Sequence, residues 1–551
     1  MAFSRVNAVI VGSGPGGGTV AKELAEAGLS VVLMERGKWL SFTDCGHDEL
    51  GSQFGVMERP FGPDRRHPRV IDAGNSKRII YSNQNGYHYT ASCVGGGAFA
   101  YGALGWRFMP EDFKMKSTYG VPEGSSLEDW PISYEDLAPF YDKAEEEIGV
   151  AGNYSTAPQW PALHKQPPMP PHSLTTSGVL LKAAAHRLQW HPMPLPVIRN
   201  SEQYRGRPAC LRCRWCSGYA CEVNARGGSH NTVIPAALST GNCELRINCM
   251  VAKVLTNEQG LATGIGYFDA DERYQEQRAD LVVLSASATE SPRLLFNSST
   301  RLFPNGLCNN NDWVGRNMQG HAGCRMFGLF EEDLDDDVGP GVDLAVADFC
   351  HHNPGIRGGG VLINEQGRIP YRFAMNRPPD AKRWGLAHKQ FQKKWFRHWI
   401  PLGSPCQEMP VFDARVEVDP SVKDHWNIPV IRPSGRRHPD DAKVNDFIVE
   451  KGEAWLKEAG ALEVWSGKAG TGVSGGVHQS GTCRMGDDPK TSVVNRWCQT
   501  HDIDNLFIVD ASVHVTNAGL NPGLTVFTIG FWASDYIKRQ WKSGAFRAGK
   551  G

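Results

Sequence analysis

Residues 7–35 read NAVIVGSGPGGGTVAKELAEAGLSVVLME, and this stretch decides the fold class of the chain. It begins with a short β-branched run of the kind found in buried parallel strands, and it then enters a loop that contains Gly12, Gly14 and Gly17. A helical stretch ends at a glycine, and a second strand-like run ends at Glu35. The order of strand, glycine loop, helix, strand and acid predicts a complete dinucleotide-binding βαβ unit.

The three glycines and the acid have separate expected roles in this unit. Gly12 permits the tight turn, Gly14 lets the backbone approach a pyrophosphate, and Gly17 lets the helix pack closely on the strand. Glu35 follows Gly14 by 21 positions and is placed to accept hydrogen bonds from ribose hydroxyls, which disfavours NADP. The unit by itself does not separate FAD from NAD, and a glycine-rich turn without a ligand is the alternative.

Length and composition describe an ordinary globular protein. The chain has 551 residues, which indicates two or more layered domains. Hydrophobic residues make up 40% of the chain and charged residues 21%, as in soluble globular proteins. The formal net charge is -1, so the charge balance favours neither nucleic acid nor anionic lipid as a partner.

The first apolar run of the chain belongs to a predicted strand rather than to a secretory signal, because it lacks a charged flank and a cleavage site. No stretch approaches the roughly 18 to 20 apolar residues that a membrane-spanning helix needs. We therefore expect a cytoplasmic protein without a direct membrane span. Export together with a signal-bearing partner stays open.

Six further motifs follow one another along the chain. They are SCVGGGAFAY (92–101), LVVLSASATESPRLLFNS (281–298), VGRNMQGH (314–321), HQSGTCRMG (478–486), LFIVDAS (506–512) and NPGLT (521–525). Together they resemble the glucose–methanol–choline (GMC) family of FAD oxidoreductases, and the stretch from 322 to 470 carries much less of the resemblance. The resemblance implies an α/β fold, with a Rossmann-type FAD-binding domain and a substrate domain built on an antiparallel β-sheet.

The resemblance also implies which residues hold FAD. It places the glycine turn against the flavin and pyrophosphate, a strand backbone at the adenine, and the end of a late strand near the ribityl chain or pyrophosphate. The residues concerned are Val94, Gly95, Gly96, Gly97, Tyr101, Val251, Asp510, Ala511 and Pro522. Plain core packing is the alternative for Val251, and turn capping is the alternative for Asp510. The stretch AFAY offers no histidine for covalent attachment, so we expect non-covalent FAD. One departure is Ser287, where the family usually has glycine.

Two residues match the catalytic positions of the family. We expect His478 to be the base that takes the proton of a substrate hydroxyl, since imidazole is the side chain whose ordinary pKa lies near neutrality. We expect the Asn521 amide to donate to the substrate oxygen as alkoxide character develops. A structural histidine and a helix-capping asparagine are the alternatives. His321 is expected to support the structure or the cofactor.

Three segments narrow the resemblance. WPISYEDLAPFYDKAEEEIGV (130–150), HNTVIPAALSTGNCELR (230–246) and a cysteine segment are most similar to the flavoprotein subunits of gluconate and fructose dehydrogenases. This branch implies oxidation of a hydroxyl group of a sugar, sugar acid or polyol by hydride transfer to flavin N5, with electrons passed to a non-oxygen acceptor. It also implies a small subunit and an electron-accepting cytochrome as partners. A sugar oxidase that makes hydrogen peroxide and a lyase with structural FAD stay open.

The cysteine segment holds four of the 14 cysteines within twelve residues, at Cys210, Cys213, Cys216 and Cys221. Thiolates this close in sequence can converge on iron or zinc. The resemblance to sugar dehydrogenases implies a [3Fe–4S] cluster, for which we expect Cys210, Cys216 and Cys221 as ligands, with Cys213 spare. A disulfide, a zinc site and a set of silent thiols are the alternatives.

Both expected domains are discontinuous. The FAD-binding domain comprises residues 1–40, 90–130, 205–320 and 471–551, and the substrate-binding domain comprises 41–89, 150–204 and 322–470. The alternating segment 245–269 turns at 257–260 and predicts a β-meander in the FAD-binding domain. ARVEVD (414–419) is expected to join the sheet that roofs the pocket, and Trp or His side chains between 351 and 426 are candidates for contacts with a sugar.

Overall fold

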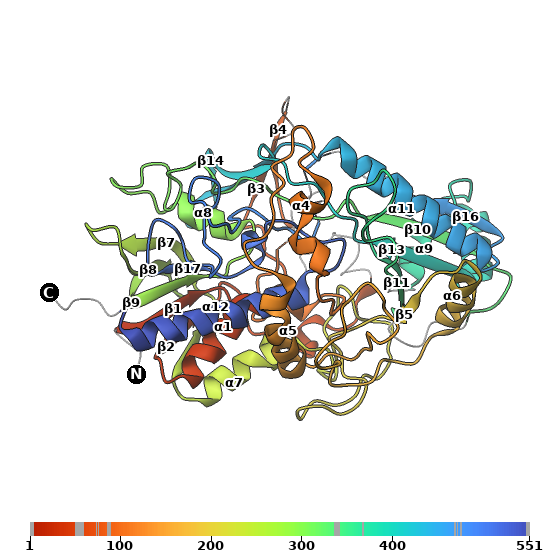
Figure 1. Cartoon of the computed structure of the whole chain (residues 1–551), viewed down its shortest axis with the longest axis horizontal. Coiled ribbons are helices and arrows are strands. Elements are labelled where there is room, and N and C mark those ends of the chain that lie inside the picture. The colour runs from red at the N-terminus through yellow and green to blue at the C-terminus, as the bar shows by residue number, and fades with distance from the viewer. Residues whose placement is uncertain are drawn as a thin grey trace.

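The computed structural model describes residues 5–49, 60–72, 74, 76–84, 87, 90–334, 342–365, 369–467, 470, 472–473 and 476–546. These residues form two large β-sheets that lie at opposite ends of the long axis of the molecule, each with its own helices (Figure 1). The first sheet contains both strands of the predicted dinucleotide unit, and the second is formed by strands from the ranges 150–204 and 322–470.

The strand order of the first sheet places the dinucleotide unit at its centre. The order is β6 (Cys243–Arg246), β2 (Val31–Met34), β1 (Arg5–Val11), β9 (Tyr274–Leu284), β8 (Ala262–Phe268) and β7 (Met250–Thr256), and β17 (Leu506–Ile508) also pairs with β9. β6, β2, β1, β9 and β17 are parallel neighbours, whereas β7, β8 and β9 form an antiparallel meander. The meander turns where expected, because the Gly260 N–H donates to Asn257 O at 3.1 Å.

Four helices pack around this sheet. Helix α1 (Pro15–Glu26) leads from β1 to β2 and packs against α7 (Val233–Ser239) and α12 (Gly523–Ser543), while α5 (Tyr134–Ile148) packs on α12. The start of α5 follows from its sequence, since Ser133 and Asp136 form a capping box. The Asp136 N–H donates to Ser133 Oγ at 3.2 Å, and the Ser133 N–H donates to Asp136 Oδ2 at 2.9 Å.

The second sheet is antiparallel throughout. Its order is β16 (Glu463–Ser466), β10 (Cys324–Leu329), β13 (Trp399–Ser404), β12 (Leu362–Asn364), β11 (Leu344–Val346) and β5 (Pro192–Pro194). Side chains from alternate positions of β10 enter two different cores. Met326 packs in the cluster that contains Ile448 of α11 (Pro439–Glu458), whereas Phe327 packs in the cluster that contains Phe373 of α9 (Pro370–Met375). Helix α6 (Thr176–Arg187) lies beside α11, and α10 (Gly385–Trp395) lies beside α9.

One expected strand does not join the second sheet. β14 (Arg415–Lys423) pairs only with β15 (Pro429–Ser434), and this ribbon packs against β3 (Arg69–Asp72) and α8 (Glu290–Phe296). The prediction that ARVEVD roofs the pocket as part of the larger sheet is therefore wrong. The physical reason is that Val416 and Ile431 bury their side chains with Met318, in a small core of their own.

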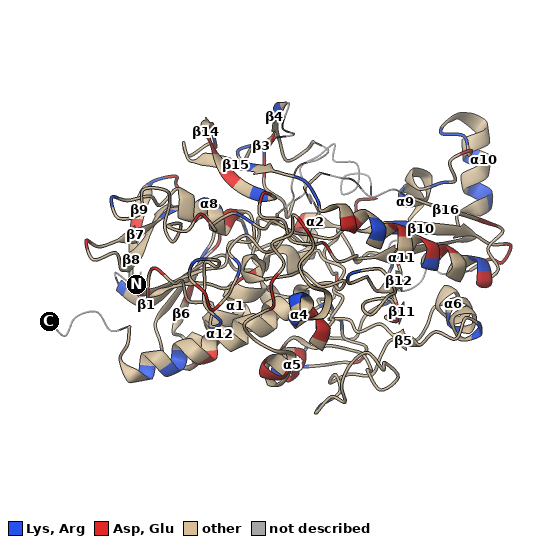
Figure 2. Ribbon diagram, turned by 45° about the horizontal axis from the view of Figure 1, so that its top comes forward, with Lys and Arg blue, Asp and Glu red and all other residues tan. Residues whose placement is uncertain are grey.

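The remaining described elements are short, and the surface is mixed in charge. They are α2 (Phe42–Cys45), α4 (Met115–Tyr119) and β4 (Lys77–Ile80), which pairs with β3, together with single turns of 3₁₀ helix at Gly96–Phe99, Pro110–Phe113, Ser229–Asn231 and Ala511–Val513. Acidic and basic residues are interspersed along α11, in keeping with the net charge of -1 (Figure 2). Within the ranges given above, no helix is both long enough and apolar enough to cross a bilayer.

Candidate active site

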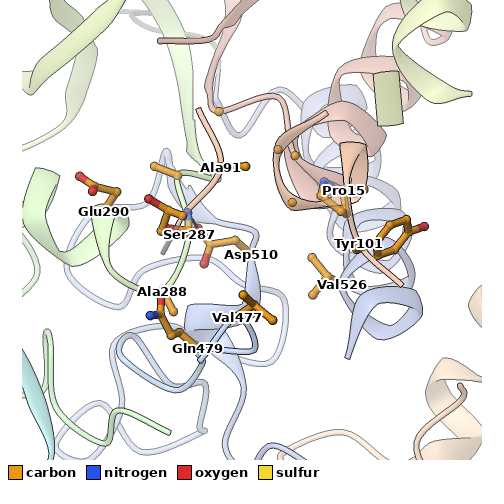
Figure 3. A pocket seen from close by; sticks show the side chains of 18 of the residues that line it. Pro15, Ala91, Tyr101, Ser287, Ala288, Glu290, Val477, Gln479, Asp510 and Val526 are labelled. Atoms are coloured by element: carbon orange, nitrogen blue, oxygen red, sulfur yellow. Dashed lines mark hydrogen bonds between the residues drawn. The ribbon is translucent and has the colours of Figure 1, made fainter. Parts of the chain in front are cut away.

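A cavity of about 540 Å³ extends from the glycine loop after β1 to the face of the second sheet. Its volume lies within the range of about 300 to 1,000 Å³ that is usual for ligand sites. Figure 3 shows Pro15, Tyr101 and Val526 on one side of this cavity and Ser287, Ala288 and Glu290 on the other. We call the part next to the first sheet the cofactor half and the part next to the second sheet the substrate half.

The glycine loop at the cofactor half has the geometry that the sequence predicts. Gly12 has a φ of +100°, and a Cβ there would lie 2.2 Å from Ser285 O. A Cβ on Gly17 would lie 2.0 Å from Gly12 O, so helix and strand pack backbone to backbone. At Gly14 the surroundings are open, with no heavy atom within 4 Å of a Cβ position, and no side chain caps the helix that begins at Pro15. This open helix N-terminus fits the pyrophosphate of FAD.

Glu35 lines the cavity and connects its two glycine-rich loops through hydrogen bonds. Its Oε2 accepts from Ser13 Oγ at 2.6 Å, and its Oε1 accepts from the Gly37 N–H at 2.9 Å. The Gly95 N–H donates to Ser13 Oγ at 3.2 Å, which connects the second glycine turn to the same acid. Burial raises the pKa of Glu35, and the bond from Ser13 opposes this rise. Ser13 is thus a structural partner that sequence reasoning missed.

The second glycine turn contributes some of its predicted residues to the cavity wall. Gly96, Gly97 and Tyr101 line the cavity, whereas Val94 and Gly95 are not among its lining residues. Gly95 lies behind the wall, where a Cβ would meet the His230 side chain at 2.9 Å. The Tyr101 hydroxyl donates to Gly227 O at 2.7 Å, which leaves the ring as the part that faces the cavity.

The other predicted cofactor residues come together at the strand ends. Val251, Asp510, Ala511 and Pro522 all line the cavity. Asp510 also caps the next turn, since its Oδ1 accepts from the Ser512 N–H at 2.8 Å and its Oδ2 accepts from Ser291 Oγ at 2.6 Å. Asp510 thus caps a turn and also lies on the cavity wall.

Ser287, the residue that departs from the family pattern, has an unusual backbone. Its φ is +95°, in a region that glycine adopts without cost and other residues rarely adopt. Its N–H donates to Asp510 Oδ2 at 3.0 Å, and it lines the cavity (Figure 3). The backbone at position 287 thus has the conformation that glycine favours, although the residue is a serine.

The predicted catalytic pair lies on the wall of this same cavity. His478 and Asn521 both line it, and the Asn521 Oδ1 is buried without a hydrogen-bond partner among the described residues. Burial lowers the pKa of His478 to about 4, so its imidazole is neutral at pH 7 and able to accept a proton. A neutral imidazole and a side-chain amide on one cavity wall are suited to an incoming hydroxyl group, because the imidazole can accept its proton while the amide N–H donates to its oxygen.

Behind His478 lies a buried polar layer that holds it in place. Asn517 Nδ2 donates to His478 O at 2.9 Å and to Gly320 O at 3.1 Å. The His321 ring meets the His478 ring edge-on, with centroids 4.9 Å apart and planes at 86°. Burial, together with the neighbouring His478, lowers the pKa of His321 well below its usual value. His321 therefore packs against the expected base as a neutral ring.

The substrate half contains charged side chains that sequence reasoning did not identify. Arg325, Glu365 and Arg372 line it together with Val342 and Ile363. No Trp or His between 351 and 426 is among the described residues of the cavity wall. The one sequence feature that could have indicated this site is that Arg325 is the charged residue of an otherwise apolar strand, β10.

The four clustered cysteines do not form a ligand set. Each of the 14 cysteines is a free thiol, and no three His, Cys, Asp or Glu side chains converge on a possible metal position anywhere in the described ranges. Cys216 Sγ instead accepts from Arg199 Nη1 at 3.0 Å, and Cys210 Sγ accepts from the Arg212 N–H at 3.3 Å. The expectation of a [3Fe–4S] cluster on Cys210, Cys216 and Cys221, with Cys213 spare, is therefore not supported.

Comparisons with known proteins agree with this geometry. Two models of the GMC oxidoreductase family match residues 123–323 and 410–530, which together exceed half of the chain. The gluconate 2-dehydrogenase flavoprotein of Pantoea cypripedii is 28% identical over 98% of this chain and 94% of that protein. The fructose dehydrogenase large subunit of Gluconobacter japonicus is 25% identical over 97% of this chain and 98% of that protein.

A solved structure supports the same fold. Pyridoxine 4-oxidase from Mesorbium loti superimposes with a TM-score of 0.60 at 16% identity, over 98% of this chain and 99% of that one. The glycine loop, the open helix N-terminus and the predicted catalytic pair all border one cavity of this fold. The chain therefore belongs to the GMC family and is an FAD-dependent oxidoreductase that acts on CH–OH groups.

Proposed function

We propose that this protein is a dehydrogenase that oxidises a hydroxyl group of a sugar, sugar acid or polyol and passes the electrons to an acceptor other than oxygen. The observation that carries the proposal is that His478 and Asn521 share one cavity with the glycine loop. The names of two relatives, a gluconate dehydrogenase flavoprotein and a fructose dehydrogenase subunit, support the substrate class and the type of acceptor.

The residues of the cavity supply the proton chemistry and the alignment. When bound, FAD supplies the hydride acceptor at flavin N5. The neutral His478 imidazole takes the proton of the substrate hydroxyl, because burial holds its pKa at about 4 and leaves a ring nitrogen free to accept at pH 7. The Asn521 amide lines the same cavity, and its Nδ2 donates to the same oxygen and stabilises the negative charge that develops there.

The layer behind the base keeps this arrangement rigid. Asn517 fixes the backbone of His478, and the His321 ring restricts rotation of its imidazole by edge-on contact. Positioning of this kind lowers the entropy that is lost when substrate and base align. Asn517 and His321 are positioning residues in this scheme, and neither needs to exchange a proton.

The proposed electron path leads out of the chain through partner proteins. A small subunit and an electron-accepting cytochrome are the proposed partners, since one relative is named as the large subunit of its enzyme. We propose that the protein works in the cytoplasm or is exported together with a signal-bearing partner. Co-purification of the tagged chain from its native host, followed by haem staining of associated bands, tests for the cytochrome.

An anaerobic titration tests the proposed activity. Addition of sugars, aldonates and alditols is expected to bleach the flavin absorbance near 450 nm, because the oxidised ring is consumed. In air, a dehydrogenase should reduce an added dye much faster than it forms hydrogen peroxide. Peroxide formed at the rate of substrate oxidation would identify an oxidase, and a flavin that stays oxidised with every hydroxyl compound would refute both readings.

A further inference from the structure

The charged side chains of the substrate half occupy defined positions on the second sheet. Arg325 of β10 and Ile363 of β12 both face Gly403 of β13 in the strand register, so the three residues form one row across the sheet. Arg325, Ile363 and Glu365 all line the cavity. This row therefore forms part of the cavity wall opposite the glycine loop.

Gly403 lets the carboxylate of Glu365 reach Arg325. A Cβ on Gly403 would lie 2.7 Å from Glu365 Cγ and 2.8 Å from its Oε1, so the Glu365 side chain lies directly over the glycine. From there Glu365 Oε1 accepts from Arg325 Nε at 3.1 Å, and Oε2 lies at the same distance. The nearby carboxylate raises the pKa of the Arg325 guanidinium. The absence of a side chain at Gly403 thus leaves the space in which this ion pair forms.

This ion pair orients the guanidinium and leaves its outer edge available. Glu365 engages Nε, and no described residue accepts from the two terminal NH₂ groups of Arg325. The Arg325 side chain is 54% exposed and lines the cavity. A guanidinium held in this way presents a planar pair of donors that matches a carboxylate.

A second arginine lies on the same wall. Arg372 of α9 lines the cavity, and its Nη2 donates to Ser217 O at 3.2 Å.

We propose that Arg325, oriented by Glu365 over Gly403, is a carboxylate-binding subsite, so that the substrate is a hydroxy acid of the aldonate type rather than a neutral sugar or alditol. The inference rests on the proposed function, which it narrows to one substrate class. Arg325 is the residue that selects the class, and Glu365 and Gly403 position it.

Binding of ligands that cannot be oxidised tests the subsite separately from the reaction. Hexanoate and hexanamide have the same length and lack a hydroxyl group, and they differ in charge. Titration of the FAD-loaded protein with each is read from the shift of the flavin absorbance and from thermal unfolding. We expect hexanoate to bind about tenfold more tightly than hexanamide, the discrimination expected of a charge-assisted hydrogen-bond pair.

Three variants identify the residues responsible. Arg325→Met is expected to weaken hexanoate binding about tenfold and to leave hexanamide unchanged, since the charged donors are lost. Glu365→Gln and Gly403→Ala are expected to weaken it less, because they disturb only the orientation of Arg325. Arg187→Met is the matched control. Arg187 is also 54% exposed and paired with a carboxylate, that of Glu458, but it lies on α6 and is absent from the cavity wall.

The same protein is then given D-gluconate and D-glucitol, which differ only by a carboxylate in place of a hydroxymethyl group. Faster flavin reduction by gluconate in the wild type, with the preference lost in Arg325→Met, supports the subsite. Equal binding of hexanoate and hexanamide, or hexanoate binding that Arg325→Met leaves intact, overturns it. If hexanoate binds as expected but no hydroxyl compound reduces the flavin, the subsite stands and the proposed function fails.

Discussion

The cofactor half and the substrate half of the cavity are built from different parts of the protein. The cofactor half is shaped mainly by backbone, at positions such as Gly12 and Gly17 where a Cβ would collide with carbonyl oxygens. The substrate half is shaped by long charged side chains, of which Arg325 and Glu365 are paired across β13, the strand between β10 and β12. Backbone geometry restricts residue choice severely, whereas a side-chain pair can change partners and position. The first half therefore restricts the backbone around the cofactor, and the second presents the side chains that, in our proposal, select the substrate class.

The largest expected effect comes from adding one methyl group to the cofactor half. Gly14→Ala should fold and yet lose most of its bound FAD, because Gly14 has an ordinary φ of -65° and a new Cβ meets no protein atom within 4 Å. The methyl group would occupy space that the pyrophosphate needs. The ratio of absorbance at 450 nm to that at 280 nm measures the loss.

Gly467→Ala is the control for this change. Gly467 also lacks a positive φ, its Cβ position is almost equally open, and it lies outside the cavity wall. It should keep a full complement of FAD. Normal FAD content in Gly14→Ala would show that the cofactor half tolerates side chains, which would remove the contrast between the two halves.

The second-largest expected effect concerns His478, which lines the cavity. His478→Ala should retain FAD and reduce the rate of anaerobic flavin reduction by about a hundredfold or more, the usual loss when a general base is removed. Stopped-flow absorbance at 450 nm gives the rate. His191→Ala, which changes an exposed histidine paired with Asp348, should leave the rate unchanged. Equal rates in His478→Ala and the wild type would exclude this residue from the mechanism.

The third effect concerns the pH dependence of stability that a buried histidine, His514, creates. His514 is fully buried between Phe108 and Trp130, and burial lowers its pKa from 6.5 to about 4. The unfolded chain therefore binds more protons than the folded protein between these values, so the free energy of unfolding falls as the pH drops from 6.5 towards 4. His514→Phe should reduce the loss of stability between pH 7.5 and pH 4.5 by about 2 kcal/mol.

Denaturant titrations at the two pH values measure this difference. His191→Phe serves as the control, because His191 is largely exposed and its replacement should leave the pH dependence unchanged. If His514→Phe lost as much stability as the wild type on acidification, the histidine would not titrate as its burial requires.

The smallest expected effect also lies in the cofactor half. Ser287→Gly should raise the free energy of unfolding by about 1 kcal/mol, because a serine at a φ of +95° is strained and a glycine is not. Ser155→Gly, at an exposed turn without a positive φ, should instead lower it slightly, since glycine increases the entropy of the unfolded chain. A destabilised Ser287→Gly would mean that the serine side chain contributes more than its backbone strain costs.

Sequence reasoning predicted the cofactor half well because glycine requirements are visible along the chain. Gly12 and Gly17 have close contacts that exclude a side chain, and His478 was found through a motif that the family shares. The second turn was less predictable in detail. Gly96 faces the cavity while its neighbour Gly95 faces His230, and composition does not reveal such alternation.

The substrate half was not predicted because its geometry depends on strand register. Arg325 and Glu365 are 40 residues apart and meet only because both flank Gly403 in the folded sheet. The prediction of an iron–sulfur cluster in the cysteine segment was not supported for a related reason. Arg212, between Cys210 and Cys213, has a φ of +57°, and spacing along the chain does not report how such a turn directs the thiols.

The position of β17 has a consequence for biosynthesis. Ser285 Oγ at the end of β9 donates to Val509 O just after β17, across 224 positions of the chain. On the ribosome, the Val282–Leu284 edge of β9 must therefore wait for its partner strand until nearly the whole polypeptide has emerged. Until β17 has emerged, this unpaired strand edge is a template for pairing with other chains. His478 and Asn521 are translated in the same final stretch, and a truncated nascent chain therefore carries the glycine loop without the predicted catalytic pair.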